Sequence, residues 1–204
     1  MKSEKLGVGL ELEKVLLEAG VELEASKVAK LEKFIDKLEW YNRVHNITGA
    51  KSREAIVDNI IDSILPTTFM YEPKSFLDVG TGAGFPGLIL AVVWDSADCV
   101  LAEPINKRAT FLRLMSQELE LKNLTIFKDK VENLEHEPFA LVTSRAVTNT
   151  KLLLELTDRV CNKETEFLFY KGSRVYDEIK ELNSQLKYDI VQKDKRNYLW
   201  IKQI

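Results

Sequence analysis

The sequence predicts an α/β fold, with a mostly parallel seven-stranded sheet, an antiparallel C-terminal hairpin and a small N-terminal helical cap. Three observations lead to this prediction. Apolar strand-like runs alternate with helical patterns from residue 75 onward, a glycine-rich turn follows the first run, and two strands joined by a short charged loop end the chain. Such alternation is typical of a parallel sheet with helices on both faces, whereas a short loop can join only antiparallel neighbours.

Residues 1–70 carry helical patterns and few strand signals, and we expect them to form the cap. Apolar residues recur at three- and four-residue steps over 31–44 and again over 56–65, which indicates two amphipathic helices. Ser52 is a candidate N-cap for the second helix. The sheet domain is then expected over residues 71–204.

The sheet domain consists of short apolar runs separated by helical segments. We expect strands over residues 75–80, 99–103, 124–128, 139–144 and 165–170, and a closing hairpin over 188–192 and 198–204. The helices between them are expected over residues 86–94, 105–120, 148–160 and 173–186.

The turn after the first strand is the most informative segment of the chain. Four glycines occur within the eight residues from Gly80 to Gly87. A side chain would block such a tight turn and keep a ligand away from the main chain, so glycine is needed where backbone contacts ligand. Strand, glycine turn and helix together form the arrangement by which a parallel sheet binds a nucleotide-like molecule.

The glycine spacing allows two interpretations. Gly82-x-Gly84-x-x-Gly87 fits the dinucleotide fingerprint of an NAD(P)-binding oxidoreductase. The segment from Asp78 to Gly84 fits the first motif of S-adenosylmethionine (SAM) methyltransferases, which also gives Asp78 and Gly80 a role. The hairpin ending favours the second interpretation, a Rossmann-like methyltransferase fold. A turn without ligand is disfavoured because four glycines cost backbone entropy.

Ligands of such sheets bind beyond the C-terminal ends of the strands, which selects a short set of candidate residues. Glu103 ends the second strand and is expected to accept hydrogen bonds from the ribose hydroxyls; the alternative is an acid favoured by the helix dipole. Val131 and Glu132 are expected to border the adenine. Arg145 ends the fourth strand, and either binds an anionic ligand group or pairs with Asp78 or Glu103.

The sequence offers no catalytic residue for acid–base or nucleophilic chemistry. No Asn-Pro-Pro-Tyr or Asp-Pro-Pro-Tyr segment follows the fourth strand, no cysteine lies at its end, and the chain has only two histidines, in positions that suit no Ser-His-Asp arrangement. The methyl acceptor should therefore be a group that needs no deprotonation. Guanine N7 is such a group, because its lone pair is free, and catalysis would then depend on positioning and desolvation.

Composition limits the remaining possibilities. The net charge of −3 argues against non-specific coating of nucleic acid, so RNA contact would depend on local basic clusters such as that of Lys171 and Arg174. Cys99 and Cys161 lie in apolar runs and are expected to be buried thiols in a reducing compartment. No metal site and no membrane span are expected. Because the N-terminus lacks an apolar signal core, we expect a cytoplasmic protein.

From about Trp40 to Gly172 the chain resembles the bacterial 16S rRNA guanine-N7 methyltransferases, the RsmG or glucose-inhibited division protein B family. The resemblance is carried by Tyr41-Asn42-x-x-x-Asn46-Ile47-Thr48, Ile61-Asp62-Ser63-Ile64-Leu65, Asp78-Val79-Gly80-Thr81-Gly82-Ala83-Gly84-Phe85-Pro86-Gly87, Lys107-Arg108-x-x-Phe111-Leu112, Thr143-Ser144-Arg145-Ala146 and Lys171-Gly172. The Gly-Phe-Pro-Gly ending and the Ser-Arg-Ala triplet are its most specific parts.

This resemblance implies that SAM donates a methyl group to N7 of a guanine in the 530 loop of 16S rRNA. Together with the motif, it gives the expected cofactor-binding residues as Asp78, Gly80, Gly82, Gly84, Phe85, Glu103, Pro104, Ile105, Val131, Glu132 and Arg145. Arg145, Lys171 and Arg174 are the expected substrate contacts. The partner would be 16S rRNA or a small-subunit particle, and the protein a monomer. A non-catalytic ribosome-binding protein with a SAM fold is a further alternative.

The chain departs from the family pattern at two positions. Asn59 stands where the family often has a histidine, and Lys130 precedes Val131 and Glu132 where the family usually has an arginine. The lysine offers a point charge in place of a planar fork. Both changes leave the glycine loop as the family has it.

Overall fold

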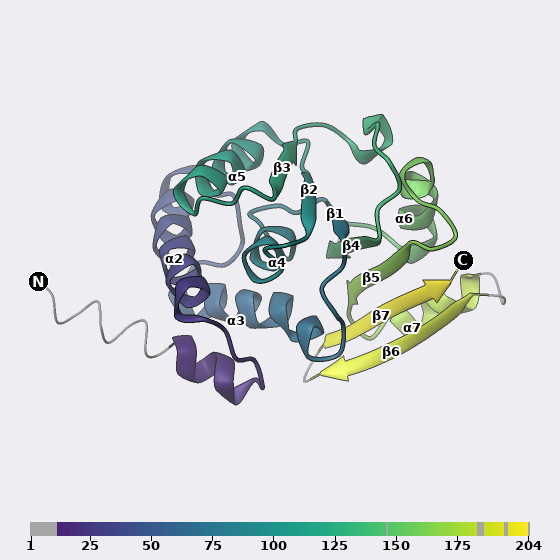
Figure 1. Cartoon of the computed structure of the whole chain (residues 1–204), viewed down its shortest axis with the longest axis horizontal. Helices are drawn as coiled ribbons and strands as arrows, with labels where there is room; N and C mark the ends of the chain where they lie inside the picture. The colour runs from purple at the N-terminus through teal and green to yellow at the C-terminus, as the bar shows by residue number, and fades with distance from the viewer. Residues whose placement is uncertain (1–11, 146, 183–185, 194–195, 204) are drawn as a thin grey trace, which may run out of the picture.

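The computed structural model describes residues 12–145, 147–182, 186–193 and 196–203. One seven-stranded sheet, with strand order β3-β2-β1-β4-β5-β7-β6, runs through the molecule (Figure 1). The first five strands are parallel, and β7 pairs antiparallel with both β5 and β6. The predicted mostly parallel sheet with an antiparallel C-terminal hairpin is confirmed.

All seven predicted strands are present, with small differences at their ends. They are β1 (Ser75–Val79), β2 (Asp98–Ala102), β3 (Leu124–Phe127), β4 (Leu141–Arg145), β5 (Glu166–Lys171), β6 (Lys187–Lys193) and β7 (Arg196–Gln203). The predicted end of the last strand, residue 204, lies outside the described residues.

The helices differ more from expectation. The α-helices are α2 (Ala25–His45), α3 (Arg53–Ile64), α4 (Gly87–Val93), α5 (Asn106–Glu118), α6 (Thr150–Thr157) and α7 (Val175–Glu178), and residues 12–18 are also helical. Short 3₁₀ turns cover Leu65–Thr68, Val131–Asn133, Asp158–Val160 and Ile179–Glu181. None of the helices described is long and apolar enough to cross a membrane.

The predicted helix over 173–186 is wrong in length. One α-helical turn, α7, is followed by a 3₁₀ turn, and residues 183–185 lie outside the described part. Val175 is the only buried residue of these two turns. Too few side chains therefore pack against the core to stabilise a longer amphipathic helix here. Tyr176, in the α-helical turn, is exposed in the structure.

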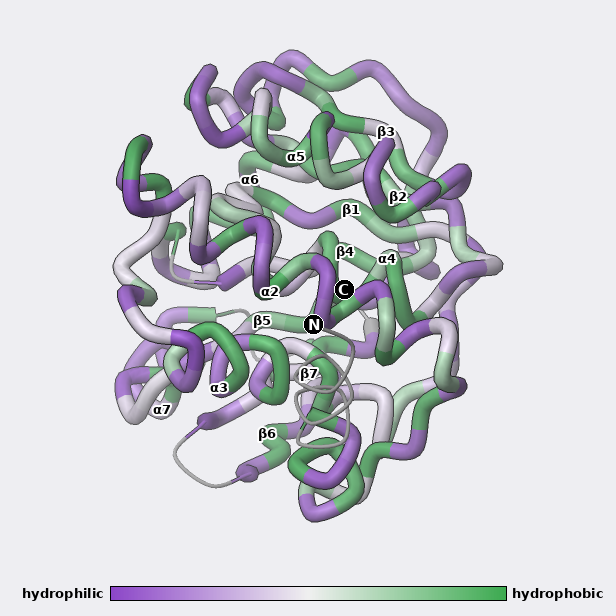
Figure 2. The backbone as a smooth tube through the Cα atoms, turned by 90° about the vertical axis from the view of Figure 1, so that its left-hand side faces the viewer, coloured by the Kyte–Doolittle hydropathy of each residue, from purple (hydrophilic) through white to green (hydrophobic). Residues whose placement is uncertain are grey.

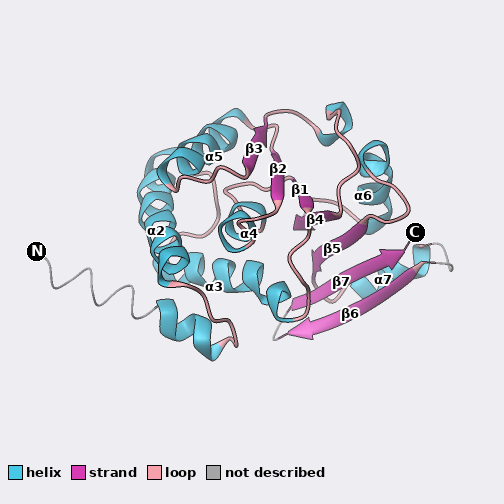
Figure 3. Ribbon diagram, viewed as in Figure 1, coloured by secondary structure: helices cyan, strands magenta, loops and turns pink. Residues whose placement is uncertain are grey.

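The sheet separates two apolar cores. Helices α2, α3, α4 and α5 cover one face, and α6 and α7 cover the other, as the ribbons of Figures 1 and 3 show. Every residue of α4 is buried, because α4 lies between the sheet and the outer helices α2 and α3. This position explains why the sequence of α4 is apolar on all sides. Figure 2 shows hydrophobic residues along α4, β1 and β4 in the interior.

The N-terminal helices join the sheet through a shared core. Phe34 of α2 is fully buried, and its ring packs edge-on against Phe85, with centroids 5.5 Å apart. The predicted Ser52 N-cap is confirmed, since its hydroxyl accepts a hydrogen bond from the Ala55 amide at 3.2 Å. The division at residue 70 stays a prediction, because core side chains from both parts form one cluster.

The junction between β1 and α4 depends on one buried carboxylate. Asp78 accepts hydrogen bonds from the Gly87 amide at 2.9 Å and from the Thr143 hydroxyl at 2.8 Å. It therefore links β1 to the start of α4 and to the neighbouring strand β4. Burial raises the pKa of Asp78 to about 6, and hydrogen bonds from Thr143 and Gly87 oppose this rise.

The close approach at this junction predicts a stability cost for any side chain at Gly87. A Cβ there would lie 2.6 Å from the Cβ of Asp78 and also against Leu101. We expect Gly87→Ala to lower the free energy of unfolding by about 1–3 kcal/mol, as measured by urea denaturation. Gly49→Ala is the matched control, because nothing lies within 4 Å of its Cβ position. Equal losses in the two variants would contradict the packing described here.

The raised pKa of Asp78 predicts a pH-dependent contribution to stability. The folded protein takes up a proton near pH 6, whereas the unfolded chain does so near the ordinary value of 3.8. The carboxyl therefore contributes stability at low pH that is lost as the pH rises through 6. Relative to Asp78→Asn, the parent should gain about 1 kcal/mol of unfolding free energy between pH 7 and pH 5. Urea denaturation of both proteins at each pH measures this, and a constant difference would contradict it.

Candidate active site

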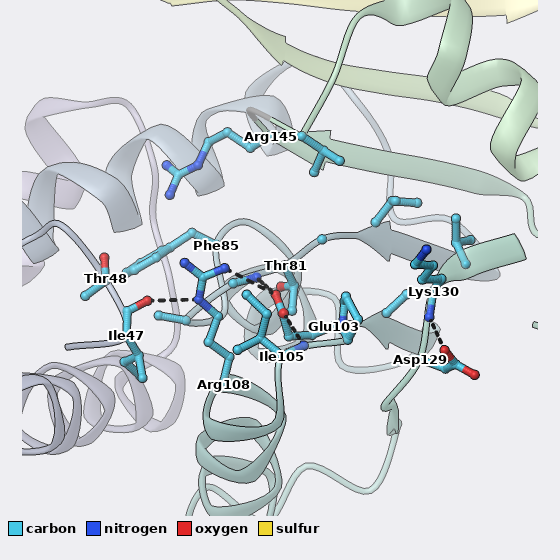
Figure 4. A pocket seen from close by; sticks show the side chains of 18 of the residues that line it. Ile47, Thr48, Thr81, Phe85, Glu103, Ile105, Arg108, Asp129, Lys130 and Arg145 are labelled. Atoms are coloured by element: carbon cyan, nitrogen blue, oxygen red, sulfur yellow. Dashed lines mark hydrogen bonds and ion pairs between the residues drawn. The ribbon is translucent and has the colours of Figure 1, made fainter. Parts of the chain in front are cut away.

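A cavity of about 540 Å³ opens at the C-terminal ends of β1, β2 and β4. Nine of the residues expected to bind the cofactor line it, namely Gly80, Gly82, Phe85, Glu103, Pro104, Ile105, Val131, Glu132 and Arg145. The fold therefore places these residues, which are far apart in the sequence, around one cavity, as the strand-end rule predicts. Figure 4 shows the labelled side chains around this cavity.

Asp78 and Gly84 do not line the cavity. Asp78 is fully buried behind the loop, where it bonds Gly87 and Thr143. At Gly84, a Cβ would lie 2.9 Å from the Cβ of Leu88, so this glycine faces α4. The positions of both residues indicate that they shape the loop from behind.

Of the glycines that line the cavity, Gly80 has the least space for a side chain. Its φ of +68° lies in the left-handed region, and its amide donates to the Ala102 carbonyl at 2.8 Å. A Cβ on Gly80 would lie 2.5 Å from a methyl group of Val147, which also lines the cavity. The loop main chain is therefore covered on this side by the segment that follows β4.

Glu103 lines the cavity and is bonded directly to the glycine loop. Its carboxylate is 2% exposed and accepts hydrogen bonds from the Gly82 amide at 2.9 Å and the Ile105 amide at 2.8 Å (Figure 4). Nη1 of Arg108 lies 3.9 Å from Oε2. Each carboxylate oxygen has two lone pairs, so one acceptor site on each remains for a ligand hydroxyl. Glu103 lines the cavity and also accepts from the amide of Ile105 just before α5, so the ribose role and the helix-start role both stay predictions.

Arg145 pairs with Asp62, a residue of a family motif to which the sequence analysis gave no role. Its Nη1 donates to Oδ2 of Asp62 in α3 at 2.9 Å, and its guanidinium carbon lies 5.1 Å from the ring centroid of Phe85. The expected structural partners, Asp78 and Glu103, are therefore replaced by Asp62. The helical spacing of α3 places Asp62 beside buried Ser63 but does not show which strand it meets.

The turn between α2 and α3 forms a rim of the cavity that sequence reasoning missed. Ile47, Thr48 and Gly49 line the cavity, and the Asn42 side chain holds this turn by accepting from the amides of Ile47 and Thr48. Arg108 donates to the Ile47 carbonyl at 3.1 Å, as Figure 4 shows. Arg108 at the basic start of α5 thus bonds the turn between α2 and α3 and holds it at the cavity.

A second cavity, of about 500 Å³, adjoins the first through Val147. Lys171, Arg174 and Arg196 line it, together with one acid, Glu178. Lys171 donates to Glu178 at 2.7 Å and to the Thr148 carbonyl at 3.2 Å. Of the three expected substrate contacts, Lys171 and Arg174 therefore lie together outside the first cavity, whereas Arg145 lines it.

The two positions that depart from the family pattern, Asn59 and Lys130, lie in different parts of the structure. Asn59 donates to the Ala55 carbonyl at 2.7 Å within α3, whereas Lys130 lines the first cavity beside Val131.

Both cysteines are free thiols, with Cys99 buried and Cys161 half-buried. Burial raises the pKa of Cys161 to about 11. In the part of the chain that the structure describes, no three or more His, Cys, Asp or Glu side chains form a metal-binding group.

Solved structures share this fold at low sequence identity. A methyltransferase from Geobacter sulfurreducens aligns with a TM-score of 0.61 and 14% identity, covering 84% of this chain and 89% of that one. The ribosomal protein L11 methylase from Lactobacillus delbrueckii subsp. bulgaricus aligns with a TM-score of 0.55 and 14% identity, covering 72% and 79%. These similarities support the predicted methyltransferase fold.

Sequence comparison identifies much nearer relatives. Ribosomal RNA small subunit methyltransferase G of Aliarcobacter butzleri is 40% identical over 191 residues, covering 94% of this chain and 98% of that protein. The protein of the same name from Wolinella succinogenes is 42% identical over 171 residues, covering 84% and 87%. The family model GidB, described as rRNA small subunit methyltransferase G, matches residues 27–201. The resemblance is thereby confirmed, and the chain belongs to the rRNA small subunit methyltransferase G family.

Proposed function

We propose that this protein transfers a methyl group from SAM to N7 of a guanine in the 530 loop of 16S rRNA. Membership of the family supports SAM-dependent methylation of small-subunit rRNA. The observation that carries the cofactor assignment is the cavity at the glycine loop, which Glu103 lines while bonded to the Gly82 amide. The choice of N7 and of the 530 loop follows from the family resemblance.

The cavity residues suit the parts of SAM. Gly82 presents main chain with nothing within 4 Å of its Cβ position, whereas Val147 packs beside Gly80. Glu103 retains acceptor sites for two ribose hydroxyls. Val131 offers apolar surface, and its neighbour Glu132 offers backbone, at the proposed adenine end. In this proposal Asp78 and Gly84 act indirectly, by setting the shape of the loop that meets the cofactor.

Bound SAM would supply an electrophilic methyl group on a sulfonium. The task of the protein is then to exclude water and to align the guanine with that methyl, since N7 already has a free lone pair. Phe85 and Val147 give the cavity apolar lining. No residue has to remove a proton before the attack, which agrees with the absence of a sequence motif for a general base.

We assign the second cavity to the RNA acceptor. It adjoins the first cavity through Val147, and Lys171, Arg174 and Arg196 give it more basic than acidic side chains. Arg145 lines the cofactor cavity. Cationic side chains of this kind bind phosphate groups and set the register of an RNA on a protein. In this proposal the enzyme works as a monomer in the cytoplasm on 16S rRNA or the small-subunit particle.

The activity can be tested with labelled cofactor. Purified protein is mixed with SAM carrying a labelled methyl group and with 30S particles or 16S rRNA from a strain that lacks the modification. Label should appear in 7-methylguanine from the 530 loop. Absence of that label would contradict the proposal. SAM binding without turnover on either substrate would favour the non-catalytic ribosome-binding alternative, and NADH binding without SAM binding would favour the oxidoreductase.

The ribose role of Glu103 predicts a specific loss of cofactor affinity. Glu103→Ala removes a charged acceptor of the ribose hydroxyls and leaves the Gly82 and Ile105 amides without their partner. We expect SAM binding to weaken by about 1–3 kcal/mol in titration calorimetry. Glu135→Ala, which removes an exposed acid outside the cavity lining, is the control. An unchanged dissociation constant for Glu103→Ala would remove this residue from the ribose site.

A further inference from the structure

Asp62 is the centre of a charged cluster that joins three distant parts of the chain. Its Oδ2 accepts from Arg145 of β4 at 2.9 Å, and its Oδ1 accepts from Nε of Arg196 in β7 at 2.8 Å. The hydroxyl of Tyr198, also in β7, lies 3.1 Å from Oδ1. The Asp62 and Arg145 side chains are only 15% and 14% exposed. One carboxylate of the helical cap therefore holds two arginines of the sheet.

The two arginines belong to the two cavities. Arg145 lines the cofactor cavity and Arg196 lines the second, and Val147 lines both. Figure 4 shows Arg145 extending from the end of its strand near Phe85. Asp62 thus fixes one cationic side chain on each side of the boundary between cofactor and proposed acceptor.

The cluster has more positive than negative charge. Two guanidiniums share one carboxylate, which leaves one positive charge uncompensated within the cluster. The bonds to Asp62 use one nitrogen of each guanidinium, so further N–H groups of both planar forks remain for an anion. By comparison, Lys171 in the second cavity is paired one to one with Glu178. The excess charge therefore lies where the two cavities meet.

Stability alone is a poor explanation for such a cluster. A buried ion pair often contributes little net stability, since desolvation offsets the attraction, and apolar residues of similar size serve as well. The same cluster has a clear use if the arginines must meet a phosphate group in a fixed orientation. Arginine is suited to that task because its fork binds phosphate with two parallel hydrogen bonds.

We propose that Asp62 is a positioning residue for RNA methylation, which orients Arg145 and Arg196 toward a phosphate group of the acceptor nucleotide. This inference rests on the proposed function and deepens it. Asp62 does not touch cofactor or substrate in this account. It sets two cationic groups that do touch the RNA, and it links the helical cap to the strands that carry them.

The proposal predicts a particular kinetic pattern for Asp62→Asn. The variant keeps the shape of the side chain but loses the charge that holds both guanidiniums. The arginines remain positively charged, so RNA should still bind, with a KM equal to or below that of the parent. Because the phosphate is no longer held in one orientation, kcat should fall at least tenfold. SAM affinity should stay within threefold, since Asp62 does not line the cofactor cavity.

The test compares Asp62→Asn with Glu118→Gln, each of which removes one carboxylate that bridges two cations. Glu118 bridges Lys33 and Lys37 at 2.8 and 3.1 Å, and it lines neither cavity. Steady-state methylation of 16S rRNA gives kcat and KM, calorimetry gives SAM affinity, and thermal denaturation reports folding. Glu118→Gln should keep the parent kcat. Arg196→Lys, which keeps the charge but removes the fork, should lower kcat in the same direction and serves if Asp62→Asn does not fold.

The outcomes separate this inference from the proposed function. Parent-like kcat in both Asp62→Asn and Arg196→Lys would overturn the positioning role. A tenfold loss of SAM affinity in Asp62→Asn would also overturn it, because the residue would then support the cofactor cavity as a whole. An inactive parent would overturn the proposed function together with this inference, whereas an active parent with parent-like kcat in both variants would overturn the inference alone.

Discussion

The hydrogen bond between the Asp78 carboxylate and the Gly87 amide is the constraint on which the site depends. It draws the start of α4 against β1 so closely that only glycine fits at residue 87. The intervening loop must then turn within a few residues, which requires left-handed backbone at Gly80, Gly82 and Gly84. This backbone gives the cavity its floor. A polar group buried in the apolar sheet is stable here because amide and hydroxyl donors satisfy it.

The sequence was sufficient for the sheet and for one side of the cavity, since both depend on local patterns. Strand and helix periodicity located the parallel strands, and for the sheet so predicted the strand-end rule selected Glu103 and Arg145. The same local reasoning overestimated the helix after β5, where only Val175 finds a fully buried position. It also counted Asp78 among the cofactor contacts, because spacing does not show whether a side chain on a turn faces the ligand or the core.

The remaining features of the site depend on contacts between residues far apart in the chain. Asp62 meets Arg145 and Arg196 across separations of 83 and 134 residues, and Arg108 meets the Ile47 carbonyl across 61. No periodicity encodes such pairs, because they arise only when β7 is inserted between β5 and β6 and α3 packs beside it. The helical cap is therefore part of the site, although its sequence predicted only a cover for the sheet.

The local contacts of the glycine loop and the long-range contacts of Asp62 serve different parts of the proposed reaction. Main chain and one carboxylate at the glycine loop suit a cofactor that many methyltransferases share, so a short motif can specify them. Selection of one RNA requires cationic groups held in an orientation that fits one acceptor, and here that orientation comes from the cap through Asp62. For an acceptor atom with a free lone pair, orientation and water exclusion are the main sources of rate. The rate of methyl transfer then depends on the packing between cap and sheet, which orients the arginines, rather than on an acid or base in the cavity.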